Sequence, residues 1–376
     1  MINYYKLYHM IGQGRLRYYA IKLLKLFRMR HYLIRFDLRM SCNLRCPSCY
    51  HSNPDFKDNI DTEIGAQISL EDFKKVAQEL FPYTKILYLS CSAEPLTTKK
   101  FGKYLEIVSK YNIPKVSFAT NGMLLNKEYI IASIGNKVNE IIFSMDGAKK
   151  ETYEFFRRGA VFEKVIENIR LLRDMKSEYK TNYPSIRFNY VMNAKNINEV
   201  PDFIELASSL GGDVVSFRHM GDWGGGLNFD EYSLINFPEL YNEYYEKAVS
   251  KAKQLNIEIM MATPFIINNN KENLKSVKKT KYKKYGCVNP WFYIYLRPDG
   301  LYRPCCYLPF EGNIIETTFS GHGQSEKVKK RKFNLVHDIE NSCMANVCGG
   351  QIMGRFDENS NLLLNYKKAF INGKNE

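Results

Sequence analysis

The stretch Leu33-Ile-Arg-Phe-Asp-Leu38-Arg-Met-Ser-Cys42-Asn-Leu-Arg-Cys46-Pro-Ser-Cys49 decides the fold of this chain. Its first six residues include Leu, Ile and Phe and predict a largely buried strand. Three cysteines follow on the adjoining loop, separated by three and then by two residues. Thiolates at such short spacings suit a metal ion or an iron–sulfur cluster. The sequence therefore predicts a metal-binding loop at the carboxyl end of the first strand.

Strand and helix patterns alternate from about residue 32 to residue 218. A helical stretch separates most successive strands, and connections of that length join parallel strands. We therefore expect an α/β fold, a partial (β/α)6 barrel of the TIM type with a small cysteine-rich auxiliary cluster domain near its C-terminal end. In such barrels the residues that do chemistry lie at the carboxyl ends of the strands. The expected strands are 33–38, 86–90, 116–120, 140–144, 186–192 and 214–217, and the expected helices lie near 70–80, 98–111, 124–134, 162–176 and 198–210.

The 376 residues of the chain are too many for one small domain and indicate a large domain with a smaller one. Changes in composition along the chain suggest five segments. These are a basic helical extension (1–31), the partial barrel (32–225), a helical linker (226–286), the auxiliary cluster domain (287–352) and a polar tail (353–376).

The chain is basic, with a formal net charge of +14. Its lysine-rich runs at 271–284 and 327–332 are far apart and no nucleic-acid motif accompanies them, so we expect solvated surface and no nucleic-acid partner. Residues 15–30 combine six Lys or Arg with apolar residues at helical spacing. We expect this helix to pack on the main domain, with a weak peripheral membrane contact as the alternative. No stretch resembles a spanning helix or a signal peptide, which predicts a cytoplasmic protein.

The cysteine loop resembles the signature of the radical S-adenosylmethionine (radical SAM) superfamily. Three thiolates leave one iron of a [4Fe–4S] cluster open, whereas a closed site takes four ligands. The resemblance implies that Cys42, Cys46 and Cys49 hold such a cluster and that SAM binds at the open iron. It further implies reductive cleavage of SAM to a 5′-deoxyadenosyl radical, which abstracts a hydrogen atom from the substrate. Without the resemblance, a zinc loop is the alternative for these cysteines.

Further segments that resemble motifs of this family follow the next strands. The segment Ser92-Ala93-Glu94-Pro95 resembles the family's Gly-Gly-Glu-Pro motif, and Thr120-Asn121-Gly122 resembles a recurring family turn. The segment from Ser144 to Gly159 resembles the one that contacts the ribose and the carboxylate of SAM. The resemblance assigns Glu94 to the SAM ammonium group, Ser144 to the ribose and Arg157 to the carboxylate, with Asn121 and Asn193 in the same region.

A second set of cysteines lies in the C-terminal third of the chain. The turn signal Arg297-Pro-Asp-Gly300 separates two short apolar runs and predicts a hairpin that brings Cys287 and Cys305 together. This region resembles the SPASM/twitch auxiliary domain of the superfamily, which implies a second, auxiliary [4Fe–4S] cluster. Its ligands would be Cys287, Cys305, Cys343 and Cys348, with Cys306 as a substitute for Cys305 and a structural zinc site as the alternative.

These features favour a radical oxidoreductase that hands an electron from the substrate radical to the auxiliary cluster. The result is a dehydrogenation or a cross-link in a small molecule, which we expect to be sugar-like, or in a peptide. An external one-electron reductant of the flavodoxin or ferredoxin type is implied. One alternative is a radical epimerase in which Cys91 or Cys306 donates the returning hydrogen atom. A second is an iron–sulfur or zinc binding module without catalysis.

Overall fold

The computed structural model describes residues 26–52, 65–221, 226–262, 264–267, 291–305 and 310–319, with residues 23 and 330 and the strands 362–363 and 368–371. The cysteine loop and the motifs after the next strands fall inside these ranges. Four of the candidate residues, Cys287, Cys306, Cys343 and Cys348, lie outside them, as does much of the basic segment 15–30.

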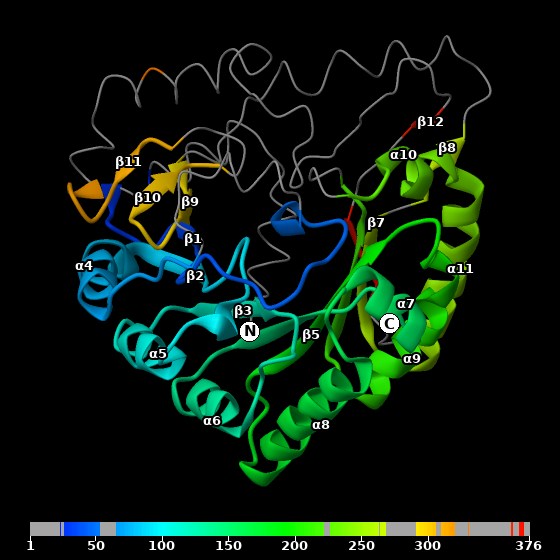
Figure 1. Cartoon of the computed structure of the whole chain (residues 1–376), viewed down its shortest axis with the longest axis horizontal. Coiled ribbons are helices and arrows are strands. Elements are labelled where there is room, and N and C mark those ends of the chain that lie inside the picture. Colours follow the sequence, from blue (N-terminus) through cyan, green and yellow to red (C-terminus); the bar gives the residue numbers. More distant parts are fainter. Residues whose placement is uncertain are drawn as a thin grey trace.

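Seven parallel strands form the centre of the structure and follow one another in chain order across the sheet (Figure 1). Each strand pairs with the next, as expected for a β/α barrel. The six strands predicted from the sequence are all present. The strands are β1 (Tyr32–Phe36), β2 (Thr84–Tyr88), β3 (Lys115–Thr120), β4 (Glu140–Ser144), β5 (Ser185–Met192), β6 (Val214–His219) and β7 (Glu258–Ala262).

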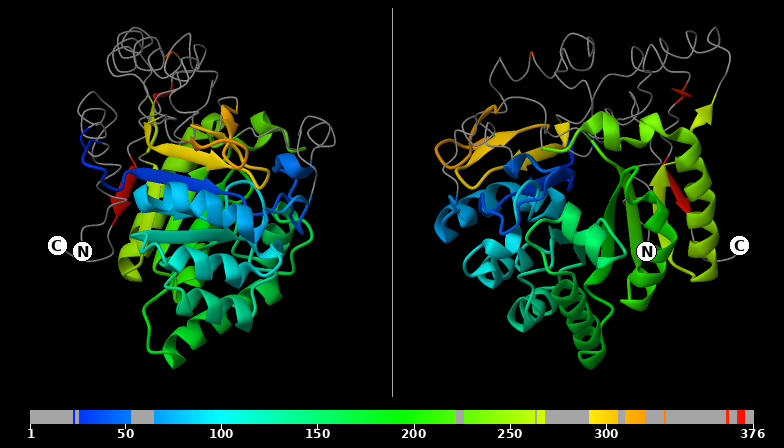
Figure 2. Two further views of the ribbon diagram at one scale, coloured as in Figure 1. Left: turned by 90° about the vertical axis from the view of Figure 1, so that its left-hand side faces the viewer. Right: turned by 45° about the vertical axis from the view of Figure 1, so that its right-hand side comes forward.

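Helices cover the outer side of this curved sheet (Figures 1 and 2). Helix α8 shows why, because Val165, Ile169 and Leu172 recur at helical spacing and are fully buried. The helices are α4 (Leu70–Leu80), α5 (Phe101–Ser109), α6 (Lys127–Gly135), α7 (Lys150–Phe156), α8 (Phe162–Glu178), α9 (Val200–Ser209), α10 (Phe229–Tyr232) and α11 (Pro238–Gln254). Short 3-10 turns are η1 (Tyr50–Ser52), η2 (Phe81–Tyr83), η3 (Pro95–Thr97), η4 (Ile197–Glu199) and η5 (Leu234–Asn236).

Strand β7 extends the parallel sheet beyond residue 225, where the sequence analysis placed the end of the barrel. The segment expected as a helical linker does contain α11, but its chain then returns as β7, whose Glu258 lies opposite Val214 of β6. A short apolar run such as Ile-Met-Met after a long helix does not distinguish a strand from irregular chain by periodicity. Only the pairing with β6 makes it part of the barrel.

Both edges of the seven-stranded unit are covered by other strands, so the barrel remains partial. The predicted hairpin is confirmed as β9 (Tyr293–Leu296) and β10 (Leu301–Arg303), and β9 pairs in parallel with β1. The region expected as a separate auxiliary domain thus begins as a continuation of the barrel sheet. At one edge, β11 (Gly312–Asn313) pairs with β10, and at the other edge β13 (Lys368–Ile371) pairs with β7. Strands β8 (Ile266–Ile267) and β12 (Leu362–Leu363) form a separate two-stranded sheet.

The strands direct alternate side chains to the helices and to the barrel interior. Phe188 of β5 packs on Phe203 of α9, with their ring centroids 5.8 Å apart. Its neighbour Arg187 points to the other face and pairs with Glu140 of β4 at 3.0 Å. Lys115 of β3 also reaches Glu140, at 3.2 Å. These ion pairs fill the interior near the amino ends of the strands and leave the carboxyl ends for the site.

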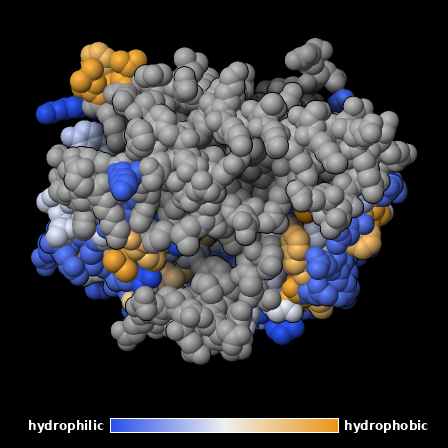
Figure 3. Space-filling view, turned by 90° about the horizontal axis from the view of Figure 1, so that it is seen from above, coloured by the Kyte–Doolittle hydropathy of each residue, from blue (hydrophilic) through white to orange (hydrophobic). Residues whose placement is uncertain are grey.

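No helix within the described ranges is long and apolar enough to cross a membrane. The space-filling view shows hydrophilic and hydrophobic side chains intermingled on the described part of one face (Figure 3).

Candidate active site

The loop that carries Cys42, Cys46 and Cys49 follows β1 at the carboxyl edge of the sheet. The Cys49 amide donates to the Cys46 carbonyl at 3.0 Å, which makes a tight turn between the second and third thiol. The Arg45 amide donates to the Arg158 carbonyl at 2.9 Å and ties the loop to the segment after α7. Cys46 is buried and the other two thiols are half-buried, so all three are shielded from solvent in part or in full.

The surroundings of the three thiols suit thiolate ligands. Burial raises the pKa of all three thiols, that of Cys42 to about 11. A hydrogen-bond donor opposes this effect at each of them: the Leu44 amide donates to the Cys42 Sγ at 3.5 Å, the Arg157 guanidinium donates to Cys46 and the His51 backbone donates to Cys49. Iron binds the deprotonated thiol, so loading the loop releases protons and gains from the donors already in place.

The arrangement of these thiols fits an iron–sulfur cluster. Within the ranges that the structure describes, no three His, Cys, Asp or Glu side chains are arranged to hold a single metal ion. In a [4Fe–4S] cluster each thiolate binds a different iron, so the sulfur atoms stand apart rather than converging. Three soft ligands on one loop suit such a cluster.

Glu94 lies in the loop after β2, and its carboxylate is directed at the loop after β3. Its Oε1 accepts from the Thr120 hydroxyl at 2.6 Å and from the Leu96 amide at 3.2 Å, and its Oε2 accepts from the Asn121 amide at 2.8 Å. Complete burial nevertheless raises the pKa of Glu94 to about 7. Glu94 therefore joins the loops after β2 and β3. The resemblance implies, in addition, a contact with the SAM ammonium group.

Asn121 connects the loop after β3 with the cysteine loop. Its Nδ2 donates to Asn43 Oδ1 at 2.9 Å, and Asn43 directly follows the first cysteine. Its Oδ1 accepts from the Met123 amide at 3.0 Å, which fixes the turn. Both ends of the Asn121 amide are therefore used to hold backbone and loop in place.

Two further candidate residues follow β4 and β5. Ser144 ends β4 on the side of the sheet that faces the barrel interior, where it lies beside Asn189 of β5. Asn193 is buried, and its Oδ1 accepts from the Lys195 amide at 2.9 Å in the turn after β5. The structure thus brings Ser144 to the interior, while the Asn193 side chain shapes its own turn.

Arg157 bridges two groups at the edge of the cysteine loop. Its Nη2 lies 2.7 Å from Asp146 Oδ2, and its guanidinium also donates to Cys46. Asp146 is fixed in turn by the Val191 amide, which donates to Oδ1 at 2.8 Å. Burial raises the pKa of Asp146, although the charge of Arg157 opposes the shift. The sequence resemblance assigns Arg157 to the SAM carboxylate. The pairing with Asp146 was not predicted, because it forms only when β4 and α7 pack.

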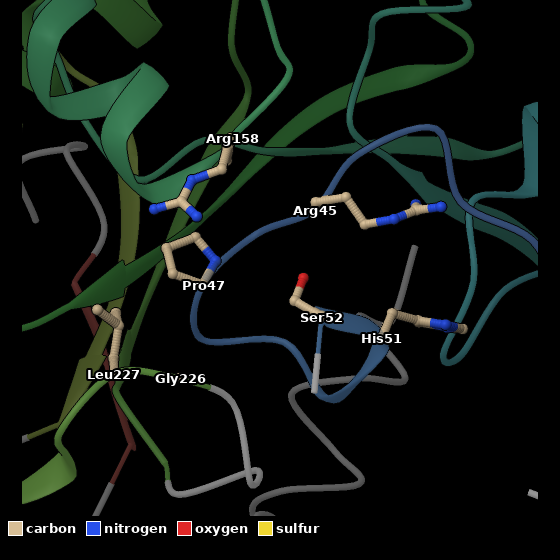
Figure 4. Close-up of a pocket in the computed structure, with 7 residues that line it drawn as sticks. All are labelled: Arg45, Pro47, His51, Ser52, Arg158, Gly226 and Leu227. Atoms are coloured by element: carbon tan, nitrogen blue, oxygen red, sulfur yellow. The ribbon is translucent and has the colours of Figure 1, made fainter. Parts of the chain in front are cut away.

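A hollow of about 360 Å³ opens beside the cysteine loop (Figure 4). Arg45 and Arg158 lie along one side of it, across from Gly226, Leu227 and His51, and both arginines are exposed. The sequence analysis assigned no role to either arginine, although Arg45 stands between two of the cysteines. The lining residues are Arg45, Pro47, His51, Ser52, Arg158, Gly226 and Leu227.

Cys91 and Cys305 are the remaining described cysteines. Cys91 is half-buried in the loop after β2, and its amide donates to Asp37 Oδ1 at 2.7 Å. Cys305 is half-buried and follows β10 of the hairpin. The other proposed ligands of an auxiliary cluster, and Cys306, are outside the described residues.

Comparison with known proteins identifies relatives of the whole described barrel. The Radical SAM superfamily description matches residues 40–218. The chain is 25% identical over 331 residues to the AdoMet-dependent heme synthase of Methanosarcina barkeri, which covers 85% of this chain and 90% of the relative. It is also 25% identical over 319 residues to the antilisterial bacteriocin subtilosin biosynthesis protein AlbA of Bacillus subtilis, covering 83% of this chain and 64% of AlbA.

A solved structure supports the fold. The crystal structure of Streptococcus suis SuiB bound to S-adenosylmethionine superposes with a TM-score of 0.62 at 13% identity, and the alignment covers 83% of this chain and 70% of SuiB. Proteins of the matched superfamily use a [4Fe–4S] cluster and SAM. The family match over residues 40–218, which includes the thiol loop after β1, identifies a radical SAM domain in this chain.

Proposed function

We propose that this chain is a radical SAM oxidoreductase with one auxiliary [4Fe–4S] cluster. The observation that carries the proposal is the loop of three shielded thiols, each with a hydrogen-bond donor in place, at the carboxyl edge of a parallel barrel. Bound there, the cluster would supply the electron that cleaves SAM to methionine and a 5′-deoxyadenosyl radical, which takes a hydrogen atom from the substrate.

The residues of the chain would bind and orient the cofactors. Cys42, Cys46 and Cys49 would hold the cluster, and the hydrogen bond from Arg157 would stabilise the thiolate that Cys46 forms when it binds iron. Glu94 and the loop that it fixes would bind the SAM ammonium group. Ser144 would contact the ribose from the barrel interior. Arg157 carries a planar guanidinium that can serve Asp146 and the SAM carboxylate together.

The auxiliary cluster would be held by Cys305 with Cys287, Cys343 and Cys348, and Cys306 could replace Cys305. Support comes from the position of Cys305, which directly follows a hairpin paired with β1, and from the relative AlbA. An external one-electron donor of the flavodoxin or ferredoxin type would reduce the first cluster. Free thiols must stay reduced to bind iron, so the proposal includes a cytoplasmic setting.

For the substrate, we propose a peptide ahead of a small molecule. AlbA takes part in the biosynthesis of the bacteriocin subtilosin, and it matches 83% of this chain. The heme synthase that also matches favours a small organic substrate as the second candidate. The sugar-like molecule expected from the sequence receives no support from these two relatives.

Anaerobic reconstitution tests the proposal. Two [4Fe–4S] clusters correspond to about eight irons per chain, and the reduced protein should release 5′-deoxyadenosine from SAM. Changing Cys42, Cys46 and Cys49 together to Ala should remove about four irons and all 5′-deoxyadenosine. Comparing its yield with added peptides and with small molecules then separates the two substrate classes. A folded triple variant that still cleaves SAM at the wild-type rate would refute the proposal.

A radical epimerase is the second candidate, and the position of Cys91 favours it. Its side chain is half-buried in the loop that leads into the proposed ammonium-binding motif. If Cys91 returns a hydrogen atom, the product formed in deuterated water carries deuterium, and Cys91→Ala loses the epimerised product. Cys306→Ala is the matched variant for the other thiol. Zinc in the purified protein, without a cluster absorption band, would instead indicate a binding module without catalysis.

A further inference from the structure

Asp37 is a buried carboxylate, 2% exposed, that directly follows β1. Its Oδ1 accepts from the amides of Cys91 at 2.7 Å and Ser92 at 3.1 Å, and its Oδ2 also accepts from the Ser92 hydroxyl. A carboxylate that collects successive backbone N–H groups fixes the direction of their peptide planes. Asp37 thereby sets the path of the loop that leads to Glu94.

The same carboxylate contacts the C-terminal hairpin. The Tyr295 hydroxyl of β9 donates to Asp37 Oδ2 at 2.9 Å and lies 3.1 Å from the Ser92 hydroxyl. Tyr295 is itself 3% exposed, so this contact is formed away from solvent. The hairpin that carries Cys305 is therefore joined to the loop before Glu94 by a side-chain bond as well as by the pairing of β9 with β1.

The opposite side of this loop is held by the cysteine loop. His51 Nε2 lies 2.9 Å from the Ser92 carbonyl, and His51 follows Cys49 by two positions. The backbone of Ser92 is thus held from both sides. Its N–H donates to Asp37, and its C=O contacts His51. A continuous chain of hydrogen bonds runs from the hairpin to the cysteine loop through Tyr295, Asp37, Ser92 and His51.

We infer that Asp37 and Tyr295 are positioning residues that make SAM binding depend on docking of the β9–β10 hairpin. With its N–H groups held by Asp37, the 91–93 loop can direct carbonyl groups and Glu94 at the SAM ammonium group. Without the Tyr295 hydroxyl, Asp37 Oδ2 loses the donor that connects it to the hairpin and retains the donors of residues 91 and 92. The inference rests on the proposed function, because it requires SAM to bind beside the cysteine loop.

Hydrogen exchange on the cofactor-free protein provides the first test. Asp37→Asn and Tyr295→Phe should each speed amide exchange in the peptide that contains residues 91–93, because the acceptor that protects these amides is weakened. Two matched controls should leave that peptide unchanged. Tyr302→Phe alters a buried tyrosine on the other strand of the same hairpin, and Asp213→Asn alters an aspartate that accepts the Ile186 amide at the amino end of β5.

The second test measures SAM affinity by the change that SAM causes in the electron paramagnetic resonance signal of the reduced, reconstituted protein. We expect Asp37→Asn to raise the Kd for SAM by about 10-fold to 100-fold, the range for a lost hydrogen bond to a charged group. Tyr295→Phe, which preserves the ring, should raise it by about 3-fold to 10-fold. Combining the two should give less than the product of the single effects, because both act on one network.

The results separate failure of this inference from failure of the proposed function. Wild-type affinity in both Asp37→Asn and Tyr295→Phe would overturn the inference, and so would an equal loss in Tyr302→Phe. If Asp37→Asn does not fold, the comparison of Tyr295→Phe with Tyr302→Phe, in hydrogen exchange and in Kd for SAM, is sufficient to decide the question. A wild-type protein whose reduced cluster shows no response to SAM would instead count against the proposed function.

Discussion

Glu94 illustrates at the scale of a single residue how the fold sets the properties of the site. Its carboxyl group accepts three hydrogen bonds, each of which favours the charged form, yet burial dominates and raises its pKa to about 7 from an ordinary 4.5. Between pH 4.5 and 7 the folded chain therefore holds a proton that the unfolded chain has released. This residue makes the folded state less stable as the pH rises through that window.

The pH dependence of unfolding in the cofactor-free chain tests this assignment. Glu94→Gln removes the titrating group, so the stability of the wild type relative to the variant should fall by about 3 kcal/mol from pH 4.5 to pH 7. Denaturant titrations at the two pH values measure the difference. Glu106→Gln, on the exposed face of α5, is the matched surface control. Parallel pH profiles for wild type and Glu94→Gln would show that Glu94 titrates normally.

At the scale of elements, the buried ion pair between β4 and β5 holds the interior of the barrel together. Burial disfavours the charged form of Glu140, but Arg187 and Lys115 outweigh it and lower the pKa of its carboxyl group. This contribution to stability is therefore present above the ordinary pKa of Glu and is lost as the pH falls through the lowered value.

Glu140→Gln should cost about 3–5 kcal/mol of unfolding free energy, because it leaves the guanidinium of Arg187 buried without its carboxylate. Glu163→Gln removes the partner of Lys150 in a solvent-exposed pair and should lower the unfolding free energy far less than Glu140→Gln. Thermal and denaturant unfolding at neutral pH measure both. Equal losses in the two variants would mean that the barrel interior is better solvated than its burial indicates.

The β9–β10 hairpin depends on a glycine at its turn. Gly300 has a φ of +86°, and a Cβ there would lie 2.7 Å from the Ile315 side chain. Gly300→Ala should therefore destabilise the hairpin by about 1–3 kcal/mol and speed hydrogen exchange in residues 291–303. Gly135→Ala, at the end of α6 with open space around it, should be neutral or slightly stabilising. Slow exchange in the hairpin of Gly300→Ala would contradict the strain argument.

At the scale of the whole molecule, strands from distant parts of the chain close both edges of the barrel sheet. Strand β9 covers β1, and β13 covers β7 with four residue pairs from Lys368–Ala262 to Ile371–Ile259. An uncovered edge presents unpaired N–H and C=O groups that invite pairing with other chains. The segment that carries β13 therefore contributes to solubility as well as to the fold.

Deleting residues 364–376 should expose the edge of β7 and increase aggregation of the cofactor-free chain. Deleting only residues 372–376 leaves β13 in place and should have little effect. Light scattering at rising temperature compares the two. Similar onset temperatures for the long and the short deletion would show that β13 does not protect this edge.

Much of the barrel was predictable because its signals are local. Apolar runs separated by amphipathic helices predict parallel strands, and β4 was located to the residue. Strand β7 was not predicted, since five residues after a long helix have no distinctive period and gain their identity only by pairing with β6. The cysteine loop was recognisable because all its ligands lie within eight consecutive residues.

The sequence alone therefore determined the order of the first six strands, the thiol loop and the motifs at the strand ends, all of which depend on residues close in the chain. Only the tertiary structure decided that Arg157 lies between Asp146 and Cys46, and that Tyr295 reaches Asp37 across 258 positions of sequence. Contacts of that separation leave no periodic trace, because they arise where two elements happen to pack. The physical environment of the candidate site, its burial and its hydrogen bonds, is set by those contacts.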